Sequence, residues 1–406
     1  YGDHRDLHRV DRRQRQMCIR DRYNGKESSR KSTVSSSSNS WSINETVPVN
    51  GGMIIDVYAS IGSLATGSLN STTTISGTTA VSGQSASDAA AGQIITVGTG
   101  NFIVTSASGV DNKLAVAGAT EDVAAFEFKA INDTYRLEAI TVTTTDETSA
   151  LGIAEVIVKD GTTEITRVPW AGTSRDITFS NPITILPGAS NAKILTLALK
   201  MAAVNSDNAG KNVKIALTGY KVNSNSIGTY TTSTNVEGKD VYVFRSKPTV
   251  SLTAGDTTLT AGTKQLARVT IAADAAGQIA FKQLVFTIAT SGSYTLSNLT
   301  LKDGSNTTIG TTNYNAGKAT TTLTTEEKTT GSKTYTLYGD IVGSIQTGDS
   351  LAVSIAAPTT GVATTSASSL IWSDISDDNH SLTTTDWWSD YLVKNLPTAS
   401  VALTTR

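Results

Sequence analysis

The sequence predicts an all-β protein made of tandem Ig-like antiparallel β-sandwich domains, with a partial repeat at the N-terminus. Three observations lead to this prediction: a long internal repeat, many short alternating segments, and no stretch that sustains a helical period. The composition agrees, because only 6% of the residues are aromatic and 17% are charged. Thr and Val, which favour strands, and Gly and Asn, which favour turns, fill the remainder.

The internal repeat places similar β-type segments about 143 residues apart, as stacked modules do. Residues 123–130 align with 266–273, and 157–161 align with 300–304. Each copy also closes on a Tyr-initiated segment that runs into a Pro-marked linker. These endings are residues 242–249 and 391–398.

The first 22 residues differ from the rest of the chain. They hold seven Arg and the only Cys, Cys18, with no hydrophobic period. Residues 17–22 resemble one reading frame of a transposase-end adapter used in sequencing libraries. We therefore expect residues 1–22 to be a cloning or sequencing scar without fixed structure. The alternative is a basic arm that binds nucleic acid or an anionic surface.

The remaining chain divides at composition shifts and at the Pro-marked linkers. We expect residues 23–92 to be a truncated upstream repeat followed by a Ser/Thr-rich linker. Two sandwich repeats should follow, and the final segment should be a tail or the start of a further repeat. Their ranges are 93–247, 248–397 and 398–406. Within the first repeat, alternation and turn residues predict strands at 94–97, 102–105, 124–128, 137–142, 154–158, 176–179, 195–199 and 213–217.

Three features carry a family resemblance: the Lys-Asp-Gly strand-turns at 159–161 and 302–304, the linker at 246–252, and the ending at 371–397. The chain resembles secreted tandem β-sandwich (Ig-like, S-layer-like) surface proteins of ultrasmall candidate-phylum bacteria, whose function is unknown. The resemblance implies an extracellular or cell-surface location, with the signal peptide lost with a missing N-terminus. Its motifs are structural, so it implies no catalytic residue.

Composition and motifs argue against several classes of function. The formal net charge of −2 gives no basic surface for nucleic acid, and no stretch has the ~18–20 apolar residues of a membrane helix. Beyond residue 22, His380 is the single His, and no phosphate-binding or metalloprotease motif occurs. An esterase-like pair, Ser350 in a Gly-Asp-Ser-Leu block and Asp377 with His380, lies in β-rich sequence that suits turns better. We therefore expect no enzyme activity, no catalytic residue and no bound cofactor other than calcium.

Two groups within residues 372–391, a stretch without a repeat partner, are the candidate functional residues. The first group offers carboxylate and amide oxygens, which are the ligands that Ca²⁺ prefers. A solvated polar loop is the simpler interpretation. The group consists of Asp374, Asp377, Asp378, Asn379 and Asp386. The second group is aromatic, and its rings could contact a glycan or a protein partner. The alternative is that the rings close the core of a sandwich. The group consists of Trp372, Trp387, Trp388 and Tyr391.

The sequence thus predicts a structural cell-surface protein, a component of an S-layer-like coat, a filament or a stalk. Its partners would be other copies of itself or neighbouring surface proteins. The first alternative is an adhesin or a carbohydrate-binding module that contacts glycans. The second is a set of ancillary domains from a secreted hydrolase.

Overall fold

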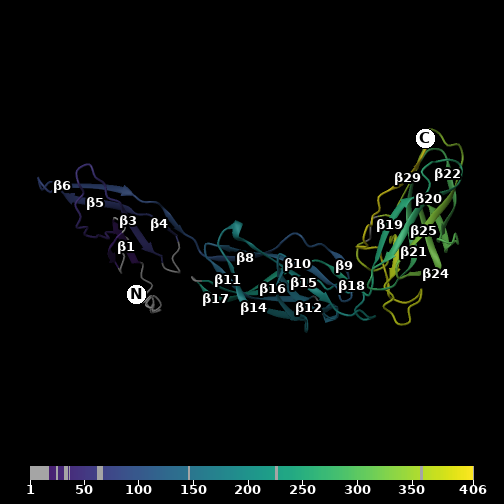
Figure 1. Ribbon diagram of the computed structural model, residues 1–406, viewed down its shortest axis with the longest axis horizontal. Coiled ribbons are helices and arrows are strands. Elements are labelled where there is room, and N and C mark those ends of the chain that lie inside the picture. The colour runs from purple at the N-terminus through teal and green to yellow at the C-terminus, as the bar shows by residue number, and fades with distance from the viewer. Residues whose placement is uncertain are drawn as a thin grey trace.

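The computed structural model describes residues 18–23, 26–31, 35, 37–61, 67–144, 147–224, 227–356 and 360–405. It is nearly all β and its sandwich sheets are antiparallel, which confirms the predicted fold class. The chain forms an elongated row, with small N-terminal sheets at one end and two sandwiches after them (Figure 1). Among the described residues, no helix is both long and apolar enough to cross a bilayer.

The N-terminal region contains more strands than the sequence predicts. A three-stranded sheet joins β1 to β2 and β3, and β5 pairs with β6 over seven residue pairs. The structure places residues 18–22 in β1, and residues 1–17 lie outside the described residues, so the assignment of 1–22 as a scar stays a prediction. The missed signal is Asn24-Gly25 between β1 and β2, a sequence typical of hairpin turns. The bounds are β1 Cys18–Tyr23, β2 Lys26–Lys31, β3 Ile55–Ser60, β4 Gly67–Leu69, β5 Thr72–Thr78, β6 Ser85–Ala91 and β7 Ile95–Val97.

The first sandwich packs a five-stranded sheet, ordered β13-β12-β15-β10-β8, against a four-stranded sheet, ordered β14-β11-β16-β17. A parallel pair of strands, β9 and β18, lies at its downstream end. The bounds are β8 Asn101–Ser106, β9 Lys113–Val116, β10 Thr120–Ile131, β11 Tyr135–Thr144, α1 Glu147–Ala150, β12 Ile153–Asp160, β13 Thr163–Pro169, β14 Ser174–Ile185, the 3₁₀ turn Ala189–Asn191, β15 Lys193–Met201, β16 Ile215–Ser224, β17 Gly228–Glu237 and β18 Val241–Phe244.

The second sandwich repeats this strand order. Its four-stranded sheet, β19-β20-β25-β22, matches β8-β10-β15-β12, and its larger sheet contains β24-β21-β26 in the place of β14-β11-β16. Strands β27 and β28 extend the larger sheet beside β21. The bounds are β19 Pro248–Ala254, β20 Gly262–Ala273, β21 Ile279–Ser291, β22 Thr295–Lys302, β23 Thr311–Asn315, β24 Lys318–Thr329, β25 Ser332–Val342, β26 Ser350–Ser354, β27 Leu370–Ser373, β28 Trp387–Trp388 and β29 Val401–Thr404.

The two repeats differ after their shared Asp-Gly turn. In the first sandwich, Gly161 takes a positive φ of 59°, and β13 folds back beside β12. In the second, the carboxylate of Asp303 instead accepts hydrogen bonds from the backbone N–H groups of Ser305 and Thr307. This wider turn sends the chain across to the opposite sheet, where β23 pairs with β24. The strand that follows the same Lys-Asp-Gly turn therefore pairs with a different partner in each sandwich.

The final strand, β29, completes the second sandwich. It pairs with β26 along 401–404 and takes the place that β17 holds in the first sandwich. The sequence predicts a tail or the start of a further repeat for 398–406, whereas the structure places 401–404 in the second sandwich. The physical reason is burial, because Leu403 is fully buried in the second core.

This placement predicts that Leu403→Ala destabilises the second sandwich by about 2–5 kcal/mol, the usual cost of emptying a buried leucine site. Ala402→Ser is the matched control, because Ala402 lies exposed on the same strand and should change stability by less than ~0.5 kcal/mol. Guanidinium unfolding of the full chain measures both. Equal stability of the two variants would contradict the placement of β29.

Candidate functional site

A mostly unrepeated segment, which runs into the repeated ending at 391–398, forms the junction between the two sandwiches. We call residues 370–396 the clasp. It starts with β27, includes β28, and packs against the end of the first sandwich where β18 leads into the linker. The site singled out from the sequence is therefore an interdomain contact.

Aromatic rings fill the centre of the junction. Phe244, the last residue of β18, is fully buried, and its ring centroid lies 4.9 Å from that of Trp372 and 5.3 Å from that of Trp388. The two repeat-equivalent tyrosines also meet, because Tyr242 and Tyr391 stack edge to face at 6.0 Å. Such aromatic pairs contribute roughly 0.5–1.5 kcal/mol each beyond the area that they bury.

A buried carboxylate fixes the orientation of the clasp. Asp374 is fully buried, and it accepts hydrogen bonds from the backbone N–H of Arg245 at 2.8 Å and from Nε1 of Trp388 at 3.2 Å. A third bond comes from the hydroxyl of Ser376 at 2.8 Å. Burial raises the pKa of Asp374, although these hydrogen bonds oppose the shift. The guanidinium of Arg245 donates in turn to the Ile375 carbonyl at 2.6 Å.

The two hydrophobic cores meet at this junction. Neighbouring residues of β9 serve different cores, because Ala115 packs in the first and Leu114 in the second. Trp388 contacts both cores, and Nζ of Lys247 in the linker donates to the Leu114 carbonyl at 2.8 Å. Gly210 lies beneath Trp388 with a φ of 69°, and a methyl group there would collide with the indole ring. The interface thus leaves no room for a side chain at position 210.

The far side of the clasp is tied to its own sandwich through His380. Its Nδ1 lies 2.7 Å from Asp386, and its Nε2 lies 2.6 Å from Glu326 on β24. Asp386 also accepts hydrogen bonds from Thr384 and Ser373. Burial opposes ionisation of Asp386, but these bonds, the Asp377 N–H and the nearby His380 outweigh it and lower its pKa.

Trp387 and Lys282 extend this cluster. Nζ of Lys282, on β21, lies 4.2 Å from the ring centroid of Trp387 and donates to the Leu382 carbonyl at 2.9 Å. Burial lowers the pKa of Lys282, and Asp386 and Glu326 oppose that shift. The chemistry of this cluster is structural, since each polar group that it brings together bonds to another part of the clasp or its sheet.

The structure disperses the candidate calcium ligands. Asp374 faces the first sandwich, Asp386 faces His380, and Asp377 accepts the Asn379 N–H at 2.8 Å. Asp378 and Asn379 are exposed. Across the described ranges, no group of three or more His, Cys, Asp or Glu side chains could hold a metal ion. The calcium site stays a prediction that this geometry does not favour.

The four candidate aromatic residues lie together, but they face inward. Trp372 is 1% exposed and Trp387 is 6% exposed, while Trp388 and Tyr391 are partly buried. They therefore close a core, which is one of the two interpretations that the sequence left open. Sequence reasoning missed their partners Phe244, Arg245, Gly210, Glu326 and Lys282. The Tyr-initiated ending at 242–249 held the only signal for any of them.

The esterase-like residues are directed elsewhere. Both ring nitrogens of His380 contact Asp386 and Glu326, and Asp349 accepts the Gln346 N–H at 2.8 Å in a turn before β26. Ser350 pairs with Ser291 and Thr404 as a strand residue. This arrangement does not assemble a nucleophile with a base.

Comparisons with known proteins show no family for this chain. No protein-family model matches it, and no curated protein is similar to it. Among solved structures, the C-terminal domain of the AgI/II polypeptide BspA of Streptococcus agalactiae is similar over 63% of this chain and 95% of its own length, with 10% identity and a TM-score of 0.19. Fibronectin(III)-like modules of Clostridium thermocellum CbhA are similar over 75% and 94%, with 15% identity and a TM-score of 0.15. At these TM-scores the likenesses support no further argument.

The contact of Gly210 with Trp388 predicts that Gly210→Ala loosens the junction. The added methyl group must displace the indole, at a cost of about 1–3 kcal/mol. Gly172→Ala is the matched control, because Gly172 has the same φ of 69° with nothing within 4 Å of the added atom. Thermal unfolding should separate the two variants, and small-angle scattering should report a wider spread of shapes for Gly210→Ala alone. Equal effects would mean that backbone strain alone acts at these positions.

The lowered pKa of Asp386 predicts a pH-dependent contribution to stability. That contribution is present above the unfolded-state pKa of ~3.9 and is lost as the pH falls through the lower folded-state pKa. Asp386→Asn should therefore cost about 1.5–3 kcal/mol at pH 7, the range for hydrogen bonds to a charged group. It should also flatten the stability profile below about pH 4.

The measurement is denaturant unfolding across pH 2–7 at constant ionic strength. The exposed Asp378 in the same segment provides the control, Asp378→Asn. A profile for Asp386→Asn that matches the unmodified chain below pH 4 would show that Asp386 does not carry this contribution.

Proposed function

We propose that this chain is a structural protein of a bacterial cell surface, in which rigidly joined β-sandwiches form a stalk, filament or coat component. The observation that carries the proposal is the clasp. The clasp is a long, mostly unrepeated segment that forms the junction with the preceding sandwich, and Phe244 and Asp374 are both fully buried there. A flexible linker needs no such contact.

The kind of contact supports a mechanical role. Ordinary interdomain interfaces are polar and permit relative motion, whereas here the two cores share Trp388. Asp374 helps to fix one orientation, because a shifted clasp would lose the hydrogen bond from the Arg245 backbone N–H and leave this buried carboxylate with one donor fewer. Such a junction transmits force and keeps the spacing between modules.

The resemblance of the strand-turns and linkers to those of secreted tandem-sandwich proteins supports the proposed location at the cell surface. Cysteine-free sandwiches rich in Thr also need no oxidising compartment to fold.

The test is the location of the native protein. Antibodies raised against the purified full chain should label intact source cells, and external protease should remove that labelling. A cytoplasmic protein probed in the same way should remain protected, which controls for lysis. Recovery of the native protein in the soluble cytoplasmic fraction would overturn the proposed function.

A further inference from the structure

The two sandwiches carry different side chains at the same place on the outer face of one sheet. In the first sandwich, Ala198 on β15 lies between Asp122 on β10 and residue 157 on β12 in the ladder. Lys159 and Asp122 form an ion pair at 2.6 Å on this face, and Ala198 is fully buried. The lysine of this sheet therefore has a carboxylate partner.

The second sandwich keeps the lysine and loses the carboxylate. Lys302 and Gln265 follow Lys159 and Asp122 at the spacing of the repeat, about 143 residues. Tyr338 takes the place of the alanine, because it lies opposite Gln265 in the ladder. The chain neighbours of Tyr338 are buried, so its partly exposed side chain lies on the outer face. Lys302 thus lacks the ion-pair partner that its equivalent has.

Two cations turn toward the ring of Tyr338. Nζ of Lys302 lies 5.0 Å from the ring centroid, a distance at which a cation and an aromatic face attract each other. The exposed guanidinium of Arg268 donates to Oε1 of Gln265, from Nε at 3.2 Å and from Nη2 at 2.8 Å. Arg268 and Lys302 are also the ladder neighbours of Thr336 on its two sides. The two positive charges therefore flank one point of the sheet.

The carboxylates around this point have other partners. Asp340 accepts hydrogen bonds from the side chains of Thr263 and Asn298. Asp256 and Asp303 accept backbone N–H groups. Among the described residues, neither of the two cations forms an ion pair with a carboxylate. Both are thus open to an anion from outside the chain.

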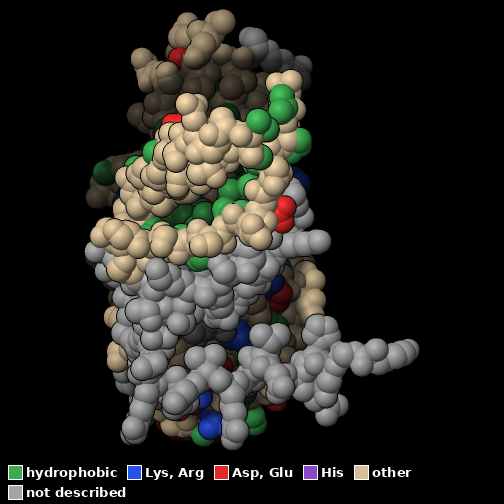
Figure 2. Space-filling view, turned by 90° about the vertical axis from the view of Figure 1, so that its left-hand side faces the viewer, with side chains coloured by type: hydrophobic (Ala, Val, Ile, Leu, Met, Phe, Trp, Pro, Cys, Tyr) green, Lys and Arg blue, Asp and Glu red, His purple; other side chains and the backbone are tan. Residues whose placement is uncertain are grey.

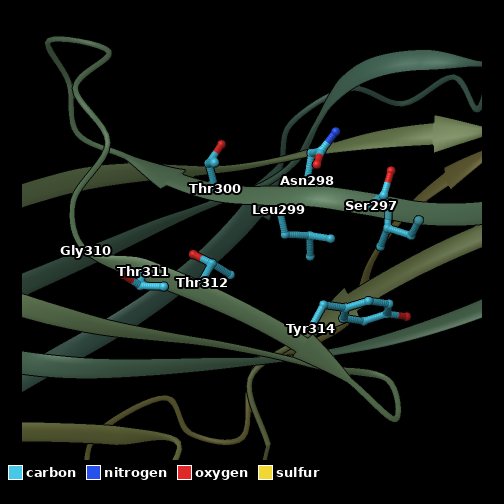
Figure 3. A pocket seen from close by; sticks show the side chains of 9 residues that line it. Ser297, Asn298, Leu299, Thr300, Gly310, Thr311, Thr312 and Tyr314 are labelled. Carbon is cyan, nitrogen blue, oxygen red and sulfur yellow. The ribbon is translucent and has the colours of Figure 1, made fainter.

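Uncharged polar side chains surround the two cations. The hydroxyls of Thr270 and Thr334 bond to each other at 2.8 Å. On the adjoining strand β22, Thr300 and Asn298 point away from the space between β22 and β23, whereas Leu299 points into it (Figure 3). Further hydroxyl residues of the outer face are Ser251, Thr253 and Thr336. The face therefore offers donors and acceptors on both sides of its positive charges.

We propose that the outer face of the sheet β19-β20-β25-β22 binds an acidic polysaccharide, with Lys302 and Arg268 holding the carboxylate of a uronic-acid unit beside Tyr338. Charge complementarity supports an anionic ligand, because the two cations have no carboxylate partner within the described chain. The surrounding hydroxyls and the Gln265 amide can exchange hydrogen bonds with sugar hydroxyls.

Other classes of partner fit this face less well. Protein partners depend on buried aromatic and aliphatic anchors, whereas Tyr338 is the one aromatic side chain that these four strands direct outward. Nucleic acid needs a broad basic surface. The formal net charge is −2, and uncharged side chains and backbone dominate the described atoms at the N-terminal end (Figure 2). The inference goes beyond the proposed function, and binding in solution does not depend on where the native protein is located.

The test measures binding of the full chain to polygalacturonate, an acidic polysaccharide, by native affinity electrophoresis. Neutral dextran in a parallel gel gives the reference mobility. Gln265→Asp restores the carboxylate that the first sandwich has beside its lysine, and Lys302→Gln removes one cation. Thr231→Asp is the matched control, because it adds the same charge on the exposed face of β17. Thermal unfolding checks that each variant is folded.

Polygalacturonate should slow the unmodified chain and Thr231→Asp alike. Gln265→Asp and Lys302→Gln should each bind about tenfold more weakly, because each removes or neutralises an interaction with a charged group. Added salt should weaken the binding that remains. No slowing of the unmodified chain, equal slowing by dextran, or equal affinity of Gln265→Asp and the unmodified chain would each overturn the inference. Equal slowing by inorganic polyphosphate would show that charge alone acts and would overturn the assignment of a sugar ligand.

Discussion

The burial of Phe244 between two tryptophans of the clasp is the interaction on which the relation of the two sandwiches depends. Apolar burial alone has no direction, so it would permit the modules to slide. Direction comes from Asp374 beside the rings, because a buried carboxylate is tolerated only where donors meet it. Hydrophobic contact supplies the affinity of the junction, and the carboxylate supplies its geometry.

Two aspartates of the clasp have different structural roles, one at the junction and one within the second sandwich. The pKa of Asp374 is raised by burial against the first sandwich, whereas hydrogen bonds lower the pKa of Asp386 on the side that faces its own sheet. One carboxylate thus costs free energy that the junction offsets by packing, and the other stabilises the segment itself. The hydrogen bonds of Asp386 and Glu326 to His380 anchor the clasp on its own sheet, and this anchoring holds Asp374 in position against the first sandwich.

The sequence was sufficient for the strands whose alternation reflects one buried face, as in residues 123–130 and 266–273. It could not predict the different courses after Asp160-Gly161 and Asp303-Gly304, because Lys-Asp-Gly is shared and the two aspartates take different partners. Asp160 pairs with Lys193, whereas Asp303 accepts backbone N–H groups of its own turn. The absence of a repeat partner located the clasp. Its contacts with Gly210, Phe244 and Arg245 bring together residues more than a hundred positions apart, and local patterns carry no information about such pairings.

The clasp belongs to the later sandwich, while the surface that it covers belongs to the earlier one. During synthesis, the earlier sandwich can complete its sheets well before residues 370–396 leave the ribosome. Until then, Phe244 and the neighbouring backbone remain uncovered. The first sandwich is thus finished by the second, which gives this pair of modules a direction of maturation and makes a nascent chain stalled between them the species most exposed to aggregation.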